Sequence, residues 1–279
     1  MGTPTPEKPL DTTLRMRAIP ARSARPAPSA LRYAAMKTPE VTVLFWVVKL
    51  LTTAMGESTS DYLVYHIDPY LAVGLGALGL VVALVLQLFV RRYIAWVYWL
   101  AVLMVAIFGT MAADVLHIVL HVSYLHSSLF FASALAIIFV SWYATEKTLS
   151  IHSIYTPRRE LFYWATVMAT FALGTALGDL MAVTASLGYL GAGILFAALF
   201  ALPALAYWLL GLDEIAAFWC AYIVTRPLGA SFADWFGKPT YITGLGFGDG
   251  PVSLVLAILI VGFVAYLSVT RIDVQKATN

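Results

Sequence analysis

Eight long apolar runs constrain the fold of this 279-residue chain more than any other feature of its sequence. A transmembrane helix needs about 20 apolar residues, whereas a barrel strand needs only about 9–11 with alternating polarity, so these runs predict helices. The composition, 61% hydrophobic and 11% charged, excludes an ordinary soluble domain. The predicted fold class is therefore an all-α membrane protein with eight transmembrane helices. The runs cover residues 41–64, 70–90, 95–121, 127–145, 161–186, 190–210, 214–235 and 251–270.

Basic residues lie asymmetrically around the predicted helices. Residues 1–37 are rich in Arg, Pro and Ser and are expected to form a disordered basic tail. Further basic residues fall in the even-numbered connections and after the last helix, whereas the opposite connections carry only Lys238. The positive-inside rule therefore predicts a multi-pass protein of a bacterial inner membrane with both termini in the cytoplasm. The basic residues outside the tail are Arg91, Arg92, Lys147, Arg158, Arg159, Arg271 and Lys276.

A motif repeats on each odd-numbered predicted helix: a tryptophan, a glycine ten residues later and an aspartate five residues after that. Successive copies start 53, 65 and 55 residues apart, which predicts four two-helix repeats. The repeats are expected at 38–94, 95–158, 159–212 and 213–271, with a C-terminal tail at 272–279. The motif residues are Trp46, Trp99, Trp164 and Trp219; Gly56, Gly109, Gly174 and Gly229; and Asp61, Asp114, Asp179 and Asp234.

The number of helices in each unit fixes the relative orientation of the repeats. Because each repeat contains two spans, all four lie the same way up, which permits a pseudo-symmetry axis along the membrane normal. If the odd-numbered helices surround that axis, the four motif aspartates lie at equal depth and form an acidic ring of the kind that selects cations.

The repeated motif also carries a resemblance to a known family. The chain resembles bacterial membrane proteins built of four tandem repeats of unknown function, each with two transmembrane segments and a characteristic tryptophan. The resemblance covers residues 38–270 and includes Lys37-Thr38-Pro39-Glu40-Val41 and Thr225-Arg226-Pro227-Leu228-Gly229-Ala230. It implies the architecture and supplies no activity, so function must be inferred from the residues.

Each motif position has an expected role. The four glycines are each followed four residues later by another small residue, a spacing that predicts close helix packing. The four tryptophans are expected to be interface anchors. The four aspartates are expected to bind an ion or protons, because a carboxylate within a span costs about 2.5–3.5 kcal/mol on insertion scales. The alternative is that they make structural polar contacts.

Three further groups of residues suggest cation chemistry. Glu57 lies four residues before Asp61, so both carboxylates can chelate one ion. On an α-helix Asp114, His117 and His121 share a sector about 60° wide, which predicts a divalent-metal site. Lys49 and Arg226 are expected to compensate the buried carboxylates.

The predicted function is a cation transporter for a divalent, manganese-like metal. No nucleotide, protease or hydrolase motif is present, so an enzyme is not expected. No cofactor is assigned, and the divalent ion enters as substrate. The predicted partners are the lipid bilayer and a small cation, without nucleic acid, and a homo-oligomer is left open. Two alternatives remain: a structural scaffold held together by its aspartates, and a haem- or quinone-associated subunit that uses the histidines.

Overall fold

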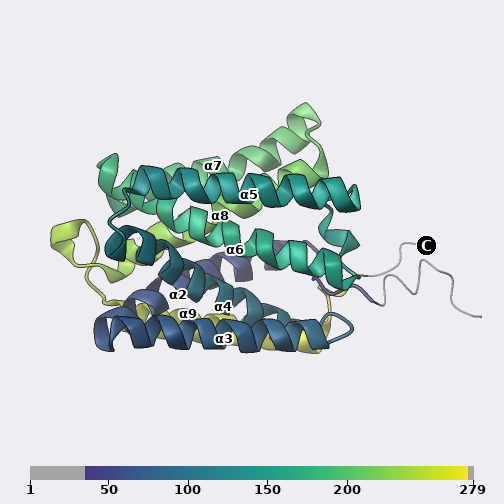
Figure 1. Cartoon of the computed structure of the whole chain (residues 1–279), viewed down its shortest axis with the longest axis horizontal. Coiled ribbons are helices and arrows are strands. Elements are labelled where there is room, and N and C mark those ends of the chain that lie inside the picture. Colours follow the sequence, from purple (N-terminus) through teal and green to yellow (C-terminus); the bar gives the residue numbers. More distant parts are fainter. Residues whose placement is uncertain (1–34, 276–279) are drawn as a thin grey trace, which may run out of the picture.

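The computed structural model describes residues 35–275, and this part of the chain is all α-helical (Figure 1). Its eight long helices coincide with the eight predicted spans. Short π-helical turns at Val115–Val119 and Leu180–Thr184 extend α4 and α6. Residues 1–34 of the predicted tail lie outside the described residues. The helices are α2 (Val43–His66), α3 (Pro69–Phe89), α4 (Ala95–Asp114), α5 (Tyr124–Glu146), α6 (Pro157–Asp179), α7 (Gly188–Leu210), α8 (Glu214–Gly237) and α9 (Asp249–Thr270).

Most of these helices begin at residues that cap them. An N-cap side chain accepts a hydrogen bond from a backbone amide of the first turn, which satisfies a donor that has no partner within the helix. Proline occupies the start of α3 and α6, where its missing N–H has no cost. The capping residues are Thr42, Asp68, Ser123, Thr156 and Asp213.

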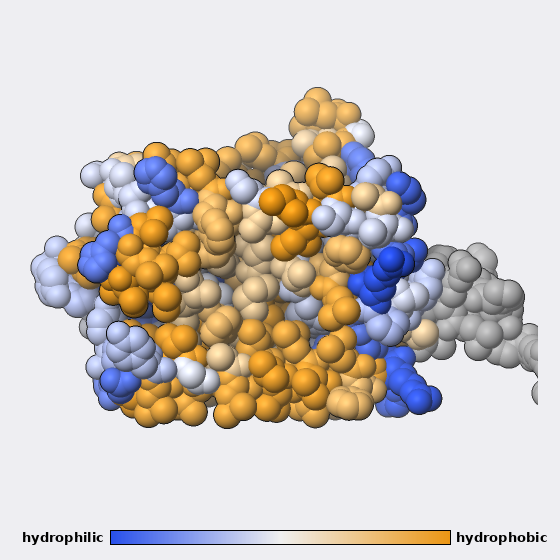
Figure 2. All heavy atoms as spheres, viewed as in Figure 1, coloured by the Kyte–Doolittle hydropathy of each residue, from blue (hydrophilic) through white to orange (hydrophobic). Residues whose placement is uncertain are grey.

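The surface of the bundle is that of a membrane protein. Within residues 35–275, seven helices are long and apolar enough to cross a membrane. The remaining one, α2, is of similar length but carries Lys49, Glu57 and Asp61. On the face shown in Figure 2, hydrophobic residues form a band across the middle of the molecule, and hydrophilic residues gather at its two ends.

The hairpins associate in a cyclic order. The first helices of the four hairpins, α2, α4, α6 and α8, pack in sequence, and α8 packs back against α2; we call these the inner helices. Each second helix packs mainly against the first helix of the following hairpin: α3 on α4, α5 on α6, α7 on α8 and α9 on α2. The last hairpin therefore contacts the first, and the chain closes on itself.

The motif glycines lie where neighbouring inner helices approach most closely. A methyl group on Gly109 would come within 2.8 Å of Phe171 Cβ, and one on Gly229 within 2.8 Å of Thr53 Cβ. Gly56 meets Ala106 and Gly174 meets Arg226 in the same way. Each contact joins a glycine to the residue three positions before the glycine of the next inner helix, so one packing rule is used four times.

Side chains fill the space enclosed by the inner helices. On each inner helix these side chains come from the residues eleven, seven and three positions before the motif glycine and one position after it. The four residues at one such position form a layer, and all members of the layers are buried. The space is therefore packed rather than open. From the end where α2 begins, the layers are Phe45, Tyr98, Tyr163 and Phe218; Lys49, Val102, Val167 and Tyr222; Thr53, Ala106, Phe171 and Arg226; and Glu57, Thr110, Thr175 and Ala230.

The motif tryptophans, which the sequence predicts to be interface anchors, take part in this packing. Trp99, Trp164 and Trp219 are only 2–5% exposed and belong to an aromatic core. Trp46 is partly buried and stacks edge-on against Phe200. They lie beside the first aromatic layer, so their indoles pack between helices.

Candidate functional site

Arg226 of α8 connects all four inner helices. Its Nη2 donates to Glu57 Oε2 at 2.5 Å and to Thr175 Oγ1 at 2.7 Å, and it also contacts Thr110 Oγ1. Its Nη1 donates to the backbone carbonyl oxygen of Thr53 at 3.3 Å. Because the guanidinium is fully buried, these bonds replace water as its partners. One side chain thus fixes the relative positions of α2, α4, α6 and α8.

A group of carboxylates lies next to Arg226, toward the end of the bundle where the inner helices finish. Ligand oxygens of Glu57, Asp61 and Asp234 lie within 4.8 Å of one another. Among residues 35–275, this is the group whose geometry could hold a metal ion. Two of its members come from α2 and one from α8, the first and last repeats. We call these three residues the acidic triad.

Lys238, directly after α8, turns back onto the acidic triad. Its Nζ lies 2.5 Å from Asp61 Oδ2 and 4.0 Å from Asp234 Oδ1. Burial lowers the pKa of this ammonium, but Asp61 and Asp234 outweigh burial, so the pKa is raised above its ordinary value. Lys238 therefore stays charged and places a cation against two of the three carboxylates.

The other two motif aspartates lie beside the acidic triad. Asp114 and Asp179 end α4 and α6 and are partly buried. Asp114 interacts electrostatically with Asp61, Glu57 and Asp179, so the carboxylates belong to one electrostatic cluster. The triad itself does not include Asp114 or Asp179.

The two predicted histidine ligands lie after the α-helical part of α4, His117 in the π-helical turn and His121 just beyond it. The α-helix ends at Asp114, five residues follow in a π-helical turn, and His121 has a left-handed backbone with φ 55°. The helical geometry that placed Asp114, His117 and His121 in one sector therefore does not extend to His121. His117 Nδ1 donates to the Val122 carbonyl oxygen at 2.8 Å, and His121 Nδ1 to that of Val119 at 3.1 Å. In both rings Nε2 is left for a ligand.

The two basic residues expected to compensate the carboxylates differ in their surroundings. Arg226 pairs with Glu57. Lys49 is 1% exposed, and its Nζ makes no hydrogen bond within the described part of the chain. The Lys49 ammonium lies over two aromatic rings instead, 3.9 Å from the Phe171 centroid and 4.2 Å from that of Tyr222. Charge compensation by direct pairing thus applies to Arg226 alone of the two.

A second polar cluster closes the opposite end of the bundle. Lys37, which the sequence placed in the tail, is buried and pairs with Glu160. Lys37 Nζ also donates to the carbonyl oxygens of Gln87 and Leu88, both at 3.2 Å, and Gln87 Nε2 donates to Glu160 Oε1 at 3.1 Å. Basic residues gather around this end, which we call the basic end: Arg91, Arg92, Lys147, Arg158, Arg159 and Arg271.

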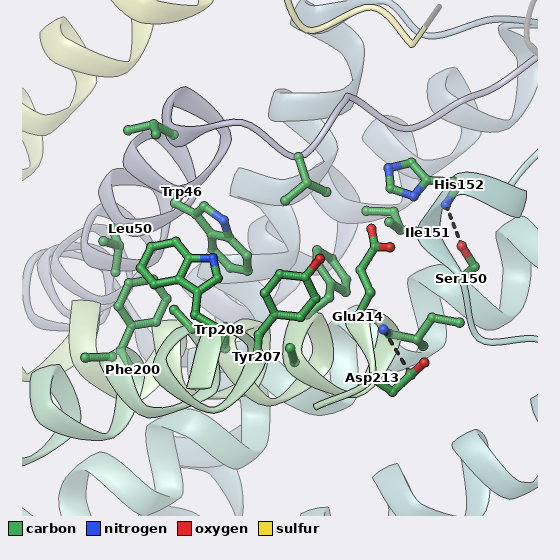
Figure 3. A pocket seen from close by; sticks show the side chains of 18 of the residues that line it. Trp46, Leu50, Ser150, Ile151, His152, Phe200, Tyr207, Trp208, Asp213 and Glu214 are labelled. Carbon is green, nitrogen blue, oxygen red and sulfur yellow. Dashed lines mark hydrogen bonds between the residues drawn. The ribbon is translucent and has the colours of Figure 1, made fainter. Parts of the chain in front are cut away.

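A groove lies on the surface between α2, α7 and α8, away from the acidic triad. Its volume is about 880 Å³. Figure 3 shows Trp46 of α2 facing Phe200 and Trp208 of α7, with His152 and Glu214 at one end of the groove. Its lining is mostly aromatic and aliphatic, so it adds an apolar surface rather than a second acidic site.

Sequence reasoning missed two parts of the site. Thr110 and Thr175 occupy the position equivalent to Glu57, one residue after the motif glycine, and this shared position is the signal that could have joined them to Arg226. Lys238 is the other part, because its local sequence indicates a loop and does not show that the loop folds back toward Asp61.

Four segments of the chain, residues 44–93, 97–148, 162–211 and 217–273, match a repeat of unknown function, DUF347. These segments agree with the four repeats predicted from the tryptophan–glycine–aspartate motif, and each covers one hairpin of the fold. No curated protein and no solved structure matches the chain. The chain belongs to the family of multi-span membrane proteins built from this repeat.

Proposed function

We propose that this protein is a membrane carrier for a small divalent cation, manganese-like in its ligand preference, and that the acidic triad binds the ion. The observation that carries this proposal is the convergence of Glu57, Asp61 and Asp234 oxygens within 4.8 Å, with the Lys238 ammonium against them. Carboxylate oxygens are the ligands that magnesium, calcium and manganese ions prefer. Lys238 then occupies the place that the ion takes when it binds.

The charges around the acidic triad support exchange rather than permanent occupancy. Glu57 is already bonded to Arg226, and Asp61 to Lys238, so an incoming divalent ion competes with two fixed cations. Lys238 belongs to the connection between α8 and α9, whereas Arg226 is held inside the bundle. Movement of Lys238 away from Asp61 is therefore the simplest step that opens the site.

The packed interior supports a carrier rather than an open channel. Buried aromatic and aliphatic layers lie between the basic end and Arg226, so an ion at the acidic triad has no open path through the ring. In the proposed arrangement α2 spans the membrane together with the other seven long helices, and the inner helices surround a pseudo-symmetry axis. The basic end faces the cytoplasm of a bacterial inner membrane. In this proposal Asp114, His117 and His121 form a weaker site beside the acidic triad, and Asp179 adds negative charge.

A scaffold role is the second candidate, because one observation favours it. Arg226 bonds to groups on α2, α4 and α6, so the buried charges also hold the inner helices together. In that case the carboxylates need no ion. A haem-binding role has less support, because His117 and His121 lie in one connection and not on two facing helices.

Calorimetric titration of the purified protein in detergent with manganese(II) tests the carrier proposal. Wild type is expected to bind with saturation, and Lys238→Met is expected to bind about tenfold more tightly, because the competing ammonium is gone. Lys147→Met is the matched control, since Lys147 is exposed at the basic end. Absence of saturable binding in both wild type and Lys238→Met would remove the carrier proposal and leave the scaffold.

A further inference from the structure

A small pocket lies at the basic end, between the start of α4 and the end of α9, which pack against each other. Its volume is about 270 Å³, just below the range of about 300–1,000 Å³ that is usual for drug-sized ligands. The acidic triad lies at the opposite end of the bundle, so this pocket is a separate site. Its polar and aromatic lining consists of Arg92, Tyr93, Trp96, Ser268, Arg271 and Asp273.

Two arginines supply the positive charge of the pocket. Arg92 lies shortly before α4 and Arg271 directly follows α9, so they come from the two segments that border the pocket. Both residues are exposed, and neither makes an ion pair within residues 35–275. A guanidinium forms two parallel hydrogen bonds to a phosphate group. Two unpaired guanidinium groups on one small pocket therefore match a phosphate.

A buried carboxylate belongs to the same pocket. Asp273 is 2% exposed, and its Oδ2 accepts a hydrogen bond from the Tyr93 hydroxyl at 2.5 Å. Its Oδ1 is buried and has no hydrogen-bond partner within the described residues. Burial raises the pKa of the Asp273 carboxyl above its ordinary value, more than the bond from Tyr93 lowers it. A ligand that brings a positively charged hydrogen-bond donor would satisfy this oxygen.

Backbone hydrogen bonds hold the pocket together. Arg271 has a left-handed conformation with φ 53°, which ends α9, and a turn that contains Asp273 follows it. The Asp273 carbonyl oxygen accepts a hydrogen bond from the Glu40 amide at 2.7 Å, and the Tyr93 amide donates to the Met36 carbonyl oxygen at 2.8 Å. The segment before α2 thus ties the two borders of the pocket to each other, so its charged groups are positioned by the fold.

Exposed apolar side chains lie beside these charged groups. Ile94 and Trp96, at the start of α4, line the pocket and are 38% and 46% exposed. Val274, in the segment after α9, also lines it and is 38% exposed. Tryptophan is enriched where a membrane meets water, at the level of the lipid headgroups. The pocket therefore offers charged groups to a headgroup and an apolar border to the chains attached to it.

We propose that this pocket binds the headgroup of a phosphatidylethanolamine molecule of the surrounding bilayer. Arg92 and Arg271 bind its phosphate, and Asp273 Oδ1 accepts a hydrogen bond from its ammonium group. A choline headgroup has no N–H to donate, and a glycerol headgroup brings a neutral hydroxyl that leaves the buried Asp273 charge without a counter-charge. The ethanolamine headgroup satisfies both requirements. This site is independent of the ion that the acidic triad is proposed to bind.

Native mass spectrometry of the purified protein, released from detergent with equal amounts of phosphatidylethanolamine, phosphatidylcholine and phosphatidylglycerol, tests this proposal. Wild type is expected to retain phosphatidylethanolamine with a preference of about tenfold, the size expected for a hydrogen bond to a charged group. Asp273→Asn should abolish the preference over phosphatidylcholine, because its amide can still accept the bond from Tyr93 but its NH₂ cannot accept one from the ammonium. Arg271→Gln should weaken binding of all three lipids about tenfold and leave their order unchanged.

Arg91→Gln is the matched control, because it removes the same charge from the exposed neighbour of Arg92, which does not line the pocket. It is expected to match wild type, and a loss equal to that of Arg271→Gln would overturn the pocket in favour of attraction by the basic end as a whole. A preference that survives Asp273→Asn, or retention of phosphatidylglycerol above the other lipids, would overturn the choice of headgroup. Equal affinity for soluble glycerophosphoethanolamine would overturn the choice of a lipid.

Discussion

The four inner helices form a ring, and the two halves of this ring have the same backbone arrangement and different side-chain chemistry. In the half formed by α2 and α8, the motif positions and their neighbours supply the acidic triad, Arg226 and Lys238. In the half formed by α4 and α6, the positions equivalent to Glu57 hold Thr110 and Thr175, and Asp114 and Asp179 lie outside the triad. The repeats thus share one mode of packing, while the charged groups are concentrated where the first and last repeats meet.

The strongest test of this comparison is removal of the charge that both halves share. Arg226→Met leaves the Glu57 carboxylate buried without a partner and is expected to lower the free energy of unfolding by about 3–5 kcal/mol. Thermal unfolding in detergent, followed by size-exclusion chromatography, measures the loss. Arg226→Met combined with Glu57→Gln should recover part of the stability, and a double variant as unstable as the single one would show that pairing with Glu57 is not the main role of Arg226.

Glycine substitutions test whether packing is the same in both halves. Gly56→Ala, in the charged half, and Gly109→Ala, between α4 and α6, each place a methyl group against the next inner helix. Each is expected to cost about 1–3 kcal/mol of unfolding free energy, as overpacking does. Gly262→Ala is the control, because a methyl group there meets nothing within 4 Å. A large loss at Gly262 or none at Gly109 would contradict the shared packing rule.

The paired aspartate variants separate the halves by function. Asp61→Asn removes a member of the acidic triad and is expected to weaken manganese binding about tenfold, or about 1.4 kcal/mol. Asp114→Asn, the equivalent change in the other half, removes a more distant charge and is expected to weaken binding less than about threefold by the same measure. Calorimetric titration of both variants compares them, and equal losses would extend the ion site to the whole ring of aspartates.

The smallest effect is expected at the two histidines. Replacing His117 and His121 together by Gln should weaken manganese binding by no more than about twofold near neutral pH. In mildly acidic buffer the difference from wild type should vanish, because a protonated imidazole cannot ligate a metal. Titrations at two pH values check this. A loss larger than that of Asp61→Asn would move the main site to the connection after α4.

The sequence predicted the helices and repeats well because both depend on local patterns. Apolar length gave the eight helices, and the spacing of Trp46, Gly56 and Asp61 and their equivalents gave the four repeats. The glycine at each motif also pointed to close packing. These features are readable because each requires only a run of residues along one helix.

The remaining parts of the site depend on contacts between helices and on irregular backbone. Helical geometry could place Glu57 near Asp61, but it could not show that Arg226, 169 residues later, lies against Glu57. It also assumed a regular helix up to His121, whereas the backbone changes after Asp114. The burial of Trp99 and Trp164 likewise results from the packing of neighbouring helices against one another, which their position along a single helix does not show.

The cyclic closure of the bundle has a consequence for biogenesis. During synthesis α2 leaves the ribosome first, with Lys49, Glu57 and Asp61, yet the partners of Glu57 and Asp61 are on α8 and directly after it. Chains are made at about 5–20 residues per second, so α2 waits for many seconds before α8 follows it. Until then its charged groups must be sheltered by the insertion machinery or by water at the membrane surface. Assembly of the ring is therefore completed only after the last hairpin enters the bilayer, and a chain that stops before Arg226 leaves Glu57 without its ion-pair partner.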